Sequence, residues 1–360
     1  MTSPTDGDRG PITSATGLAG IAAVARRGGE LRAGGTDLMS RPSRGPHVDL
    51  RGRPELSGVT WRADGAVRIG ALTTIAALAT DERIGAAHPS LALTAAGLAT
   101  PQIRAMATVG GNLLQRNRCA YFRNAAFSCF QSGGDGCPAR GGLTLRAAVV
   151  HSGPCVAPHP SSLAMALLGC EATVEVHGGE TAAETHGEAT KEAHGEATAE
   201  AHGEATAEAH GEATAETYGE ATFPVAELYG DGADPTRDHL LAPGAVLLAV
   251  VLPAPRPGER AAYHRATARS HGEWPLVEVA VRLVVDGERV VFARVAAGGV
   301  ARVPLRLPEV ENALLAGEPL ERAAALAAAR CTPTPQNAYK VALLTGTVLS
   351  ALEQARQPSP

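Results

Sequence analysis

The chain has 360 residues, enough to bury a sizeable core and to divide into two or three domains. Its formal net charge is −5, and no basic stripe of the kind that nucleic-acid binding needs is visible. No apolar run reaches the roughly 18 to 20 residues of a membrane span, and the polar N-terminus contains no apolar signal region.

The first part of the chain predicts short helices and strands in alternation. A helical stretch at 17–28 ends at glycines, which commonly terminate helices. Residues 66–80 predict a strand followed by a helix that Thr73 or Thr74 caps. Further strands are expected at 31–35 and 48–52, and alanine-rich helices between about 80 and 108.

An eight-residue repeat interrupts the middle of the chain. Units such as EAHGEATA recur between 178 and 222, after an expected helix at 161–170 and strand at 171–178 and before a strand at 223–229. Each unit holds only Ala and Thr as weakly apolar residues, so it cannot bury enough surface to offset the entropy of ordering. We therefore predict a solvated low-complexity insertion. The alternative is weak metal binding by His186, His194, His202 and His210.

The last part of the chain, from about 235, predicts a separate domain in which strands are followed by helices. Strands are expected within 244–253 and 275–300, and the DGE sequence inside the second range is typical of a hairpin turn. Helices with a period near 3.6 residues are expected at 321–330 and 338–355.

Two glycine pairs follow expected strands. In LRAGGTDLM, residues 31–39, the glycines let the backbone approach an anion closely, while Thr36 and Asp37 offer a donor and an acceptor for ribose or ribityl hydroxyls. The sequence ATVGGNLLQ, residues 107–115, repeats the pattern with Asn112 as the polar follower. Neither is the G-x-G-x-x-G fingerprint, which disfavours a doubly wound NAD fold. Together they indicate a two-sided pocket for a phosphate-bearing cofactor.

Four of the six cysteines are clustered, with the spacing C-x9-C-x7-C-x17-C. Four thiolates are the number required for a tetrahedral zinc ion or for a [4Fe–4S] cluster. The spacings are longer than the close cysteine pairs of zinc ribbons, and the intervening segment is rich in glycine, which would let backbone N–H groups approach cluster sulfides. On spacing alone, a cluster, a zinc site and four buried or free thiols all stay open.

Several of these segments together make the chain resemble a known family. The segments AGGTDL, IRAMATVGGNLLQRNRCAYFR and HPSSLAMALL, with the cysteine loop, resemble the FAD-binding medium subunit of molybdenum hydroxylases, the xanthine dehydrogenase family. ARVAAGGVARVPLR and PQNAYKVALL resemble the C-terminal domain of that family. The resemblance covers nearly the whole chain. Within the family it is most similar to the subunits of bacterial periplasmic-type aldehyde oxidoreductases, which carry an extra [4Fe–4S] cluster.

The resemblance implies an α+β fold. An FAD-binding domain of the PCMH type would comprise subdomains at 10–58 and 59–230. The second subdomain would contain a [4Fe–4S] loop at 115–157 and the low-complexity insertion at 178–222. A C-terminal α+β domain with an antiparallel sheet, like that of the CO dehydrogenase flavoprotein, would occupy 235–355.

The resemblance also implies which residues hold the cofactors. The first glycine turn would bind the FAD pyrophosphate through backbone N–H groups, and the second turn would complete the FAD site. The sequence departs from the family where HPSD is common and this chain has Ser161 and Ser162, since a hydroxyl replaces a carboxylate. The implied FAD-binding residues are Leu31, Arg32, Ala33, Gly34, Gly35, Thr36, Asp37, Leu38, Thr108, Gly110, Gly111, Asn112, Ser161 and Ser162, and the implied cluster ligands are Cys119, Cys129, Cys137 and Cys155.

The implied function is electron transfer in a heterotrimer. A large molybdopterin subunit would oxidise the substrate, expected to be an aldehyde, and a small subunit with [2Fe–2S] clusters would pass electrons through this FAD to an external acceptor. The alternatives are a related hydroxylase acting on xanthine, CO or 4-hydroxybenzoyl-CoA, and a non-enzymatic Cys/His metal-binding interaction protein. We expect the chain in the cytoplasm, or exported together with a signal-bearing partner.

Overall fold

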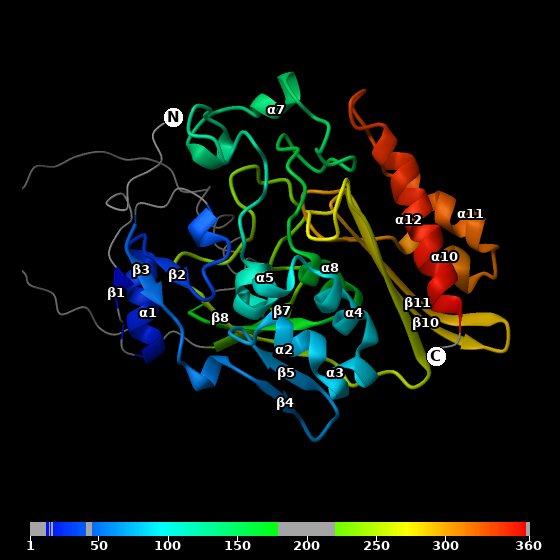
Figure 1. Ribbon diagram of the computed structural model, residues 1–360, viewed down its shortest axis with the longest axis horizontal. Helices are drawn as coiled ribbons and strands as arrows, with labels where there is room; N and C mark the ends of the chain where they lie inside the picture. The colour runs from blue at the N-terminus through cyan, green and yellow to red at the C-terminus, as the bar shows by residue number, and fades with distance from the viewer. Residues whose placement is uncertain (1–11, 14, 16, 41–44, 179–219, 358–360) are drawn as a thin grey trace, which may run out of the picture.

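The computed structural model describes residues 12–13, 15, 17–40, 45–178 and 220–357. A small N-terminal unit, a larger middle unit and a C-terminal unit follow one another along the chain, and the cysteine region rises from the middle unit at the top of the view (Figure 1). Nearly all of the octapeptide insertion lies outside the described residues. The mixture of helices with parallel and antiparallel sheets confirms the predicted α+β class.

The N-terminal unit is a small parallel sheet with one covering helix. Strands β1 (Ile12–Thr13), β2 (Glu30–Arg32) and β3 (His47–Asp49) lie in the order β1-β3-β2, and α1 (Gly17–Arg26) connects β1 to β2. Ile21 and Val48 pack with Val246 and Leu248 of the middle unit, and all four are buried. Each such side chain contributes about 1.5–3 kcal/mol when buried, so this apolar seam fixes the N-terminal unit in place.

The middle unit is built on a five-stranded antiparallel sheet in the order β4-β5-β8-β6-β7. Its central strand, β8, is buried along its whole length, which explains the continuous apolar sequence VLLAVVL. This strand lies beyond residue 235, so the predicted boundary assigned it wrongly to the C-terminal domain. The strands are β4 (Val59–Trp61), β5 (Val67–Gly70), β6 (Thr173–His177), β7 (Glu220–Pro224) and β8 (Val246–Leu252).

Short capped helices cover this sheet. The Thr74 hydroxyl accepts a hydrogen bond from the Ala77 amide at 3.1 Å, which decides between the two predicted caps. The Ser161 hydroxyl caps the most buried helix in the same way, from the Ala164 amide at 3.0 Å. The helices are α2 (Ile75–Thr80), α3 (Glu82–Ala87), α4 (Pro89–Gly97), α5 (Pro101–Met106), α6 (Val109–Leu113) and α8 (Ser162–Gly169).

The cysteine region connects α6 to α8 and consists mainly of loops. It contains only a 3-10 turn (Phe130–Ser132) and α7 (Pro138–Gly141) as helical elements. The Arg140 guanidinium donates to the carbonyl oxygens of Pro154 at 2.6 Å and Gly153 at 2.8 Å. Because such a region has little secondary structure, these side-chain bonds hold its shape.

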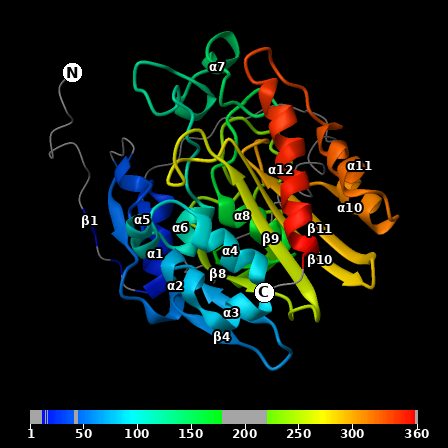
Figure 2. The same cartoon turned by 45° about the vertical axis from the view of Figure 1, so that its right-hand side comes forward.

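The C-terminal unit is an antiparallel sheet with its own helices on one face and α4 and α8 of the middle unit packed against the other. Asp286 pairs with Arg289 at the predicted hairpin, where Gly287 supplies a φ of +59°. Figure 2 shows α12 running alongside β9, and α12 packs against both β9 and β10. The elements are β9 (Glu259–Ala266), β10 (Val277–Asp286), β11 (Arg289–Gly298), β12 (Leu305–Arg306), α10 (Pro308–Leu315), α11 (Leu320–Ala325) and α12 (Tyr339–Arg356).

Lys340 on α12 is buried, which is rare for a lysine. Its ammonium group donates to the carbonyl oxygens of Gly299 at 2.6 Å and Ala147 at 3.0 Å. Burial lowers its pKa to about 8. The lysine therefore joins α12 to the end of the cysteine region. In the described part of the chain, no helix is both long enough and apolar enough to span a membrane.

Candidate functional site

The two glycine turns, 76 positions apart in the sequence, line one cavity between the N-terminal and middle units. The first turn follows β2, and the second leads from α5 into α6. Residues of β8 close the apolar side of the cavity. Its lining consists of Leu31, Ala33, Gly34, Gly35, Thr36, Asp37, Leu38, Leu50, Ala71, Leu72, Thr108, Gly110, Gly111, Leu114, Gln115, Val246 and Leu247.

The glycines allow backbone segments to approach one another around this cavity. A Cβ atom on Gly34 would overlap the carbonyl oxygen of Met106 and lie 2.6 Å from its carbonyl carbon. A Cβ atom on Gly110 would lie 2.9 Å from the Cβ of Ala71. Gly35 adopts a φ of +75°, which side-chain-bearing residues rarely adopt. The glycine pairs thus permit close backbone contact on both sides of the cavity.

The second turn is fixed by backbone hydrogen bonds to the corner between β5 and α2. The amide of Gly110 donates to the Ala71 carbonyl at 2.8 Å, and the amide of Val109 donates to the Thr73 carbonyl at 2.9 Å. The Thr108 hydroxyl caps α6 by accepting from Gly111 at 3.2 Å. These bonds hold the turn in one conformation before any ligand binds, which lowers the entropy cost of binding.

Four predicted FAD-binding residues lie outside the lining of the cavity. Arg32 forms an ion pair with Asp49 at 3.5 Å. Asn112 is buried, and its side-chain oxygen accepts the Ser161 hydroxyl at 2.7 Å, which connects the second turn to α8. Ser161 and Ser162 are themselves buried at the start of α8. A direct FAD contact by any of these four stays a prediction. The other predicted FAD-binding residues all line this one cavity.

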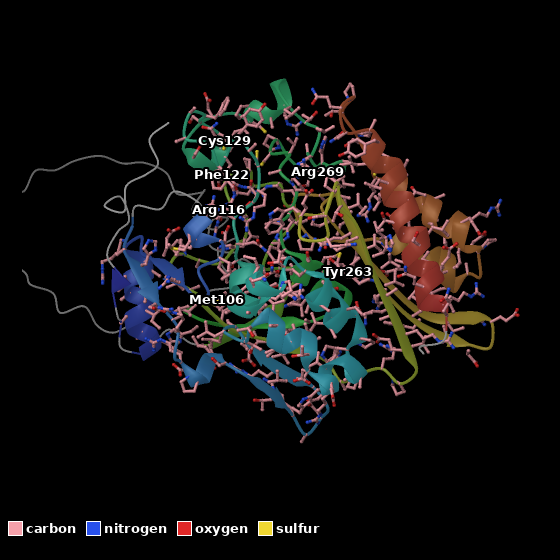
Figure 3. All side chains as sticks on the ribbon, viewed as in Figure 1. Met106, Arg116, Phe122, Cys129, Tyr263 and Arg269 are labelled. Atoms are coloured by element: carbon pink, nitrogen blue, oxygen red, sulfur yellow. The ribbon has the colours of Figure 1, made fainter. Side chains whose placement is uncertain are left out.

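The four clustered cysteines line a second cavity, close to the first. Figure 3 shows Phe122 and Cys129 above Arg116 and Met106 below it, and the Arg116 guanidinium lies 4.7 Å from the centre of the Phe122 ring. Aromatic rings therefore form part of the wall around the thiols. The lining consists of Asn117, Cys119, Tyr121, Phe122, Cys129, Phe130, Gln131, Cys137, Pro138, Ala139, Cys155 and Ala157.

The thiols in this cavity differ in acidity. A hydrogen bond with Cys155 lowers the pKa of Cys137 to about 5, helped by nearby backbone amides, whereas the same bond and burial raise the pKa of Cys155. Burial also raises the pKa of Cys119. Within the described ranges, no three His, Cys, Asp or Glu side chains converge closely enough to hold a single metal ion.

A buried carboxylate holds the start of the cysteine segment. Asp238 accepts hydrogen bonds from Arg302 Nη1 at 2.5 Å, Arg116 Nε at 2.8 Å, Gln131 Nε2 at 2.9 Å and the Asn117 amide at 3.1 Å. Burial alone would raise the pKa of Asp238, but Arg302 and Arg116 outweigh it and hold this pKa well below its usual range. Sequence analysis missed Asp238 because its loop carries no motif or periodic pattern.

A buried histidine, His159, and a half-buried one, His239, lie near this network without carrying charge. Burial lowers the pKa of His159 to about 3 and that of His239 to about 4. His159 Nδ1 accepts from the Ser161 amide at 3.2 Å, and its ring contacts that of Tyr229 edge-on at 4.5 Å. His159, the histidine of the HPSS segment, is therefore a packing residue that shapes the start of α8.

Comparisons with known proteins agree with this architecture. A family model described as the FAD binding domain in molybdopterin dehydrogenase matches residues 15–195, and one described as the CO dehydrogenase flavoprotein C-terminal domain matches residues 261–355. The aldehyde oxidoreductase FAD-binding subunit PaoB of Escherichia coli K12 is 31% identical over 91% of this chain and 92% of its own length. A xanthine dehydrogenase FAD-binding subunit of Escherichia coli O157:H7 is 40% identical over 23% of this chain and 30% of its own.

Solved structures share the fold. The reconstituted CO dehydrogenase from Oligotropha carboxidovorans matches with a TM-score of 0.66 at 21% identity, over 96% of this chain and 97% of that one. Quinoline 2-oxidoreductase from Pseudomonas putida 86 matches with a TM-score of 0.64 at 18% identity, over 99% and 98% of the two chains.

The fold and the cavity between the glycine turns define an FAD-binding oxidoreductase subunit. The chain belongs to the family of FAD-binding subunits of molybdenum hydroxylases, the group of the CO dehydrogenase and xanthine dehydrogenase flavoproteins.

Substituting Gly34→Ala should weaken FAD binding by about 10- to 100-fold, because overpacking of this kind costs about 1–3 kcal/mol and each 1.4 kcal/mol is a factor of ten. The measurement is flavin retention and the FAD dissociation constant of the purified chain. Gly85→Ala is the matched control, since a Cβ there would meet open space on α3. Equal flavin retention by the two variants would contradict the proposed need for close backbone contact.

Substituting Asp238→Asn should lower the free energy of unfolding by about 3–5 kcal/mol at neutral pH, because it leaves Arg302 buried without its counter-charge. A carboxyl group whose pKa is lower in the folded than in the unfolded chain stabilises the fold at pH values above its unfolded pKa of about 4. This contribution is lost as the pH falls toward the folded-state pKa. The difference between wild type and variant in urea titrations should therefore shrink in acid. The exposed Asp286→Asn should change stability by less than about 0.5 kcal/mol.

Proposed function

We propose that this chain is the FAD- and [4Fe–4S]-binding electron-transfer subunit of a heterotrimeric, aldehyde-oxidising molybdenum hydroxylase. One observation carries the proposal. The chain is related over nearly its full length to an aldehyde oxidoreductase FAD-binding subunit, and its four clustered cysteines line one cavity beside the glycine turns. The partners would be a small [2Fe–2S] subunit and a large molybdopterin subunit. An external acceptor would receive the electrons, in the cytoplasm or after export with a signal-bearing partner.

The cavity between the glycine turns suits the phosphate-bearing part of FAD. Backbone of the first glycine pair, 34–35, forms one wall, where peptide N–H groups can approach an anion. The second pair, 110–111, forms the opposite wall and gives it a fixed shape, because its own amides bond to Ala71 and Thr108. Leu31, Leu72 and Val246 supply an apolar side to the same space. Bound FAD would supply the redox chemistry, while these residues bind and orient it.

The second cavity suits an iron–sulfur cluster. Its four thiols line one cavity, and four cysteine thiolates are the ligand set that a [4Fe–4S] cluster takes. The lowered pKa of Cys137 favours the thiolate form that metal ligation requires. Tyr121, Phe122 and Phe130 line the same cavity and would limit the access of water. Cys119, Cys129, Cys137 and Cys155 are the proposed ligands.

The order of the two cavities along the chain supports an electron-transfer role. Asn112 ends the second glycine turn, and Cys119 follows only seven positions later. Arg116, between them, contacts both the Asp238 network and the ring of Phe122. The short rigid connection would place the two redox groups close to each other.

Purification of the tagged chain from its own cells should test the proposed assembly and substrate. We expect a complex that contains molybdenum and two further subunits, and whose flavin is reduced when an aldehyde is added without oxygen. Reduction by xanthine, CO or 4-hydroxybenzoyl-CoA, with no response to aldehydes, would overturn the aldehyde assignment in favour of a related hydroxylase.

Substituting Cys137→Ser should test the cluster separately. The variant is expected to lose most of its iron and acid-labile sulfide while it keeps most of its FAD, because the glycine turns are intact. Cys331→Ser is the matched control, since this half-buried thiol lies outside the cavity and its loss should leave iron unchanged. Iron that is absent from the wild-type chain, or equal in both variants, would refute the ligand assignment.

A further inference from the structure

Asp37 joins the first glycine turn to the cysteine segment. Its carboxylate accepts hydrogen bonds from Arg123 Nη2 at 2.7 Å and from the Arg116 amide at 3.0 Å, and it forms an ion pair with Arg118, whose Nη1 lies 3.0 Å away. All three arginines lie on the segment that leads from the second glycine turn into the cysteine loop. The side chains of Asp37, Arg118 and Arg123 are 14%, 23% and 15% exposed, so solvent screens these ion pairs only in part.

Arg123 also holds the cysteine segment in shape. Its guanidinium donates to the carbonyl oxygens of Asn117 at 2.8 Å and Arg116 at 3.0 Å. The Ser40 hydroxyl, at the end of the first turn, accepts from both Arg118 and Arg123 at 3.2 Å. The contact between turn and segment is therefore a small network, in which removal of one partner affects the others.

We propose that Asp37 is a positioning residue that locks the first glycine turn onto the cysteine segment, so that FAD affinity and the order of this segment are coupled. An ionised carboxylate has about four acceptor positions. The donors on Arg123 and Arg116 occupy two of them, and the Arg118 guanidinium adds an ion pair. Asp37 thus acts on the cofactor through the turn that it holds, although its position in the turn suggests a direct bond to a flavin hydroxyl.

The coupling is reciprocal. If an ordered segment favours the FAD-binding conformation of the turn, then bound FAD must favour the ordered segment by the same factor. The inference rests on FAD binding, and it does not require an iron–sulfur cluster. Experiments on the iron-free full chain therefore separate its failure from a failure of the cluster proposal.

A double-mutant cycle on FAD affinity tests the lock. The measurements use the iron-free full chain. Asp37→Asn and Arg123→Met should each raise the FAD dissociation constant by about 5- to 150-fold, which is the range of typical coupling between sites. The double variant should bind FAD only a little more weakly than either single variant, because both substitutions remove the same contact. Arg123→Lys should recover part of the affinity. Arg51→Met, at the exposed Asp49–Arg51 pair on the neighbouring strand, is the matched control and should leave affinity unchanged.

Hydrogen exchange supplies a second readout that loss of stability alone would not produce. FAD binding should slow amide exchange in the peptide that contains Arg116 in the wild type, and it should not do so in Asp37→Asn. If Arg123→Met fails to fold, Arg118→Met replaces it in the cycle. Weak binding by Asp37→Asn with wild-type binding by the arginine variants would overturn the proposal, because it would indicate direct flavin contact. Wild-type affinity in all variants would also overturn it.

Discussion

The buried carboxylate of Asp238 is the interaction on which the arrangement of the two cavities depends. Removing a charge from water costs several kcal/mol, and only a complete set of donors offsets this cost. Here the donors come from distant parts of the chain: Arg302 follows β11, while Arg116, Asn117 and Gln131 belong to the cysteine region. The requirement to satisfy one charge thus brings the C-terminal unit and the cysteine region together.

Two carboxylates from distant parts of the sequence hold the cysteine segment. Asp37 belongs to the N-terminal unit, Asp238 follows the insertion, and both bind Arg116, one through its amide and one through its side chain. Loops rarely keep a single conformation without such side-chain bonds. Arginine suits this role because its planar group donates to several acceptors at once. The loops that would carry the cofactors are therefore fixed by charge and hydrogen bonding, while the sheets beneath them are fixed by apolar burial.

Each of these glycines has a different structural role. Gly34 permits contact with the backbone at Met106, whereas Gly35 supplies a positive φ, and Gly110 lies against Ala71. Apolar core positions accept many side chains of similar volume, but a position without room for a Cβ accepts only glycine.

The α+β class, most helix and strand positions and the two glycine turns could be predicted from the sequence, because capping, periodicity and backbone freedom are local properties. Three further features emerge only in the folded chain: β8 completes the middle sheet, Lys340 is buried, and Asn112 contacts α8. Folding also brings Asp238 to the cysteine segment. These features depend on contacts between residues far apart in sequence, and the energy of such contacts leaves no periodic or local pattern in the chain.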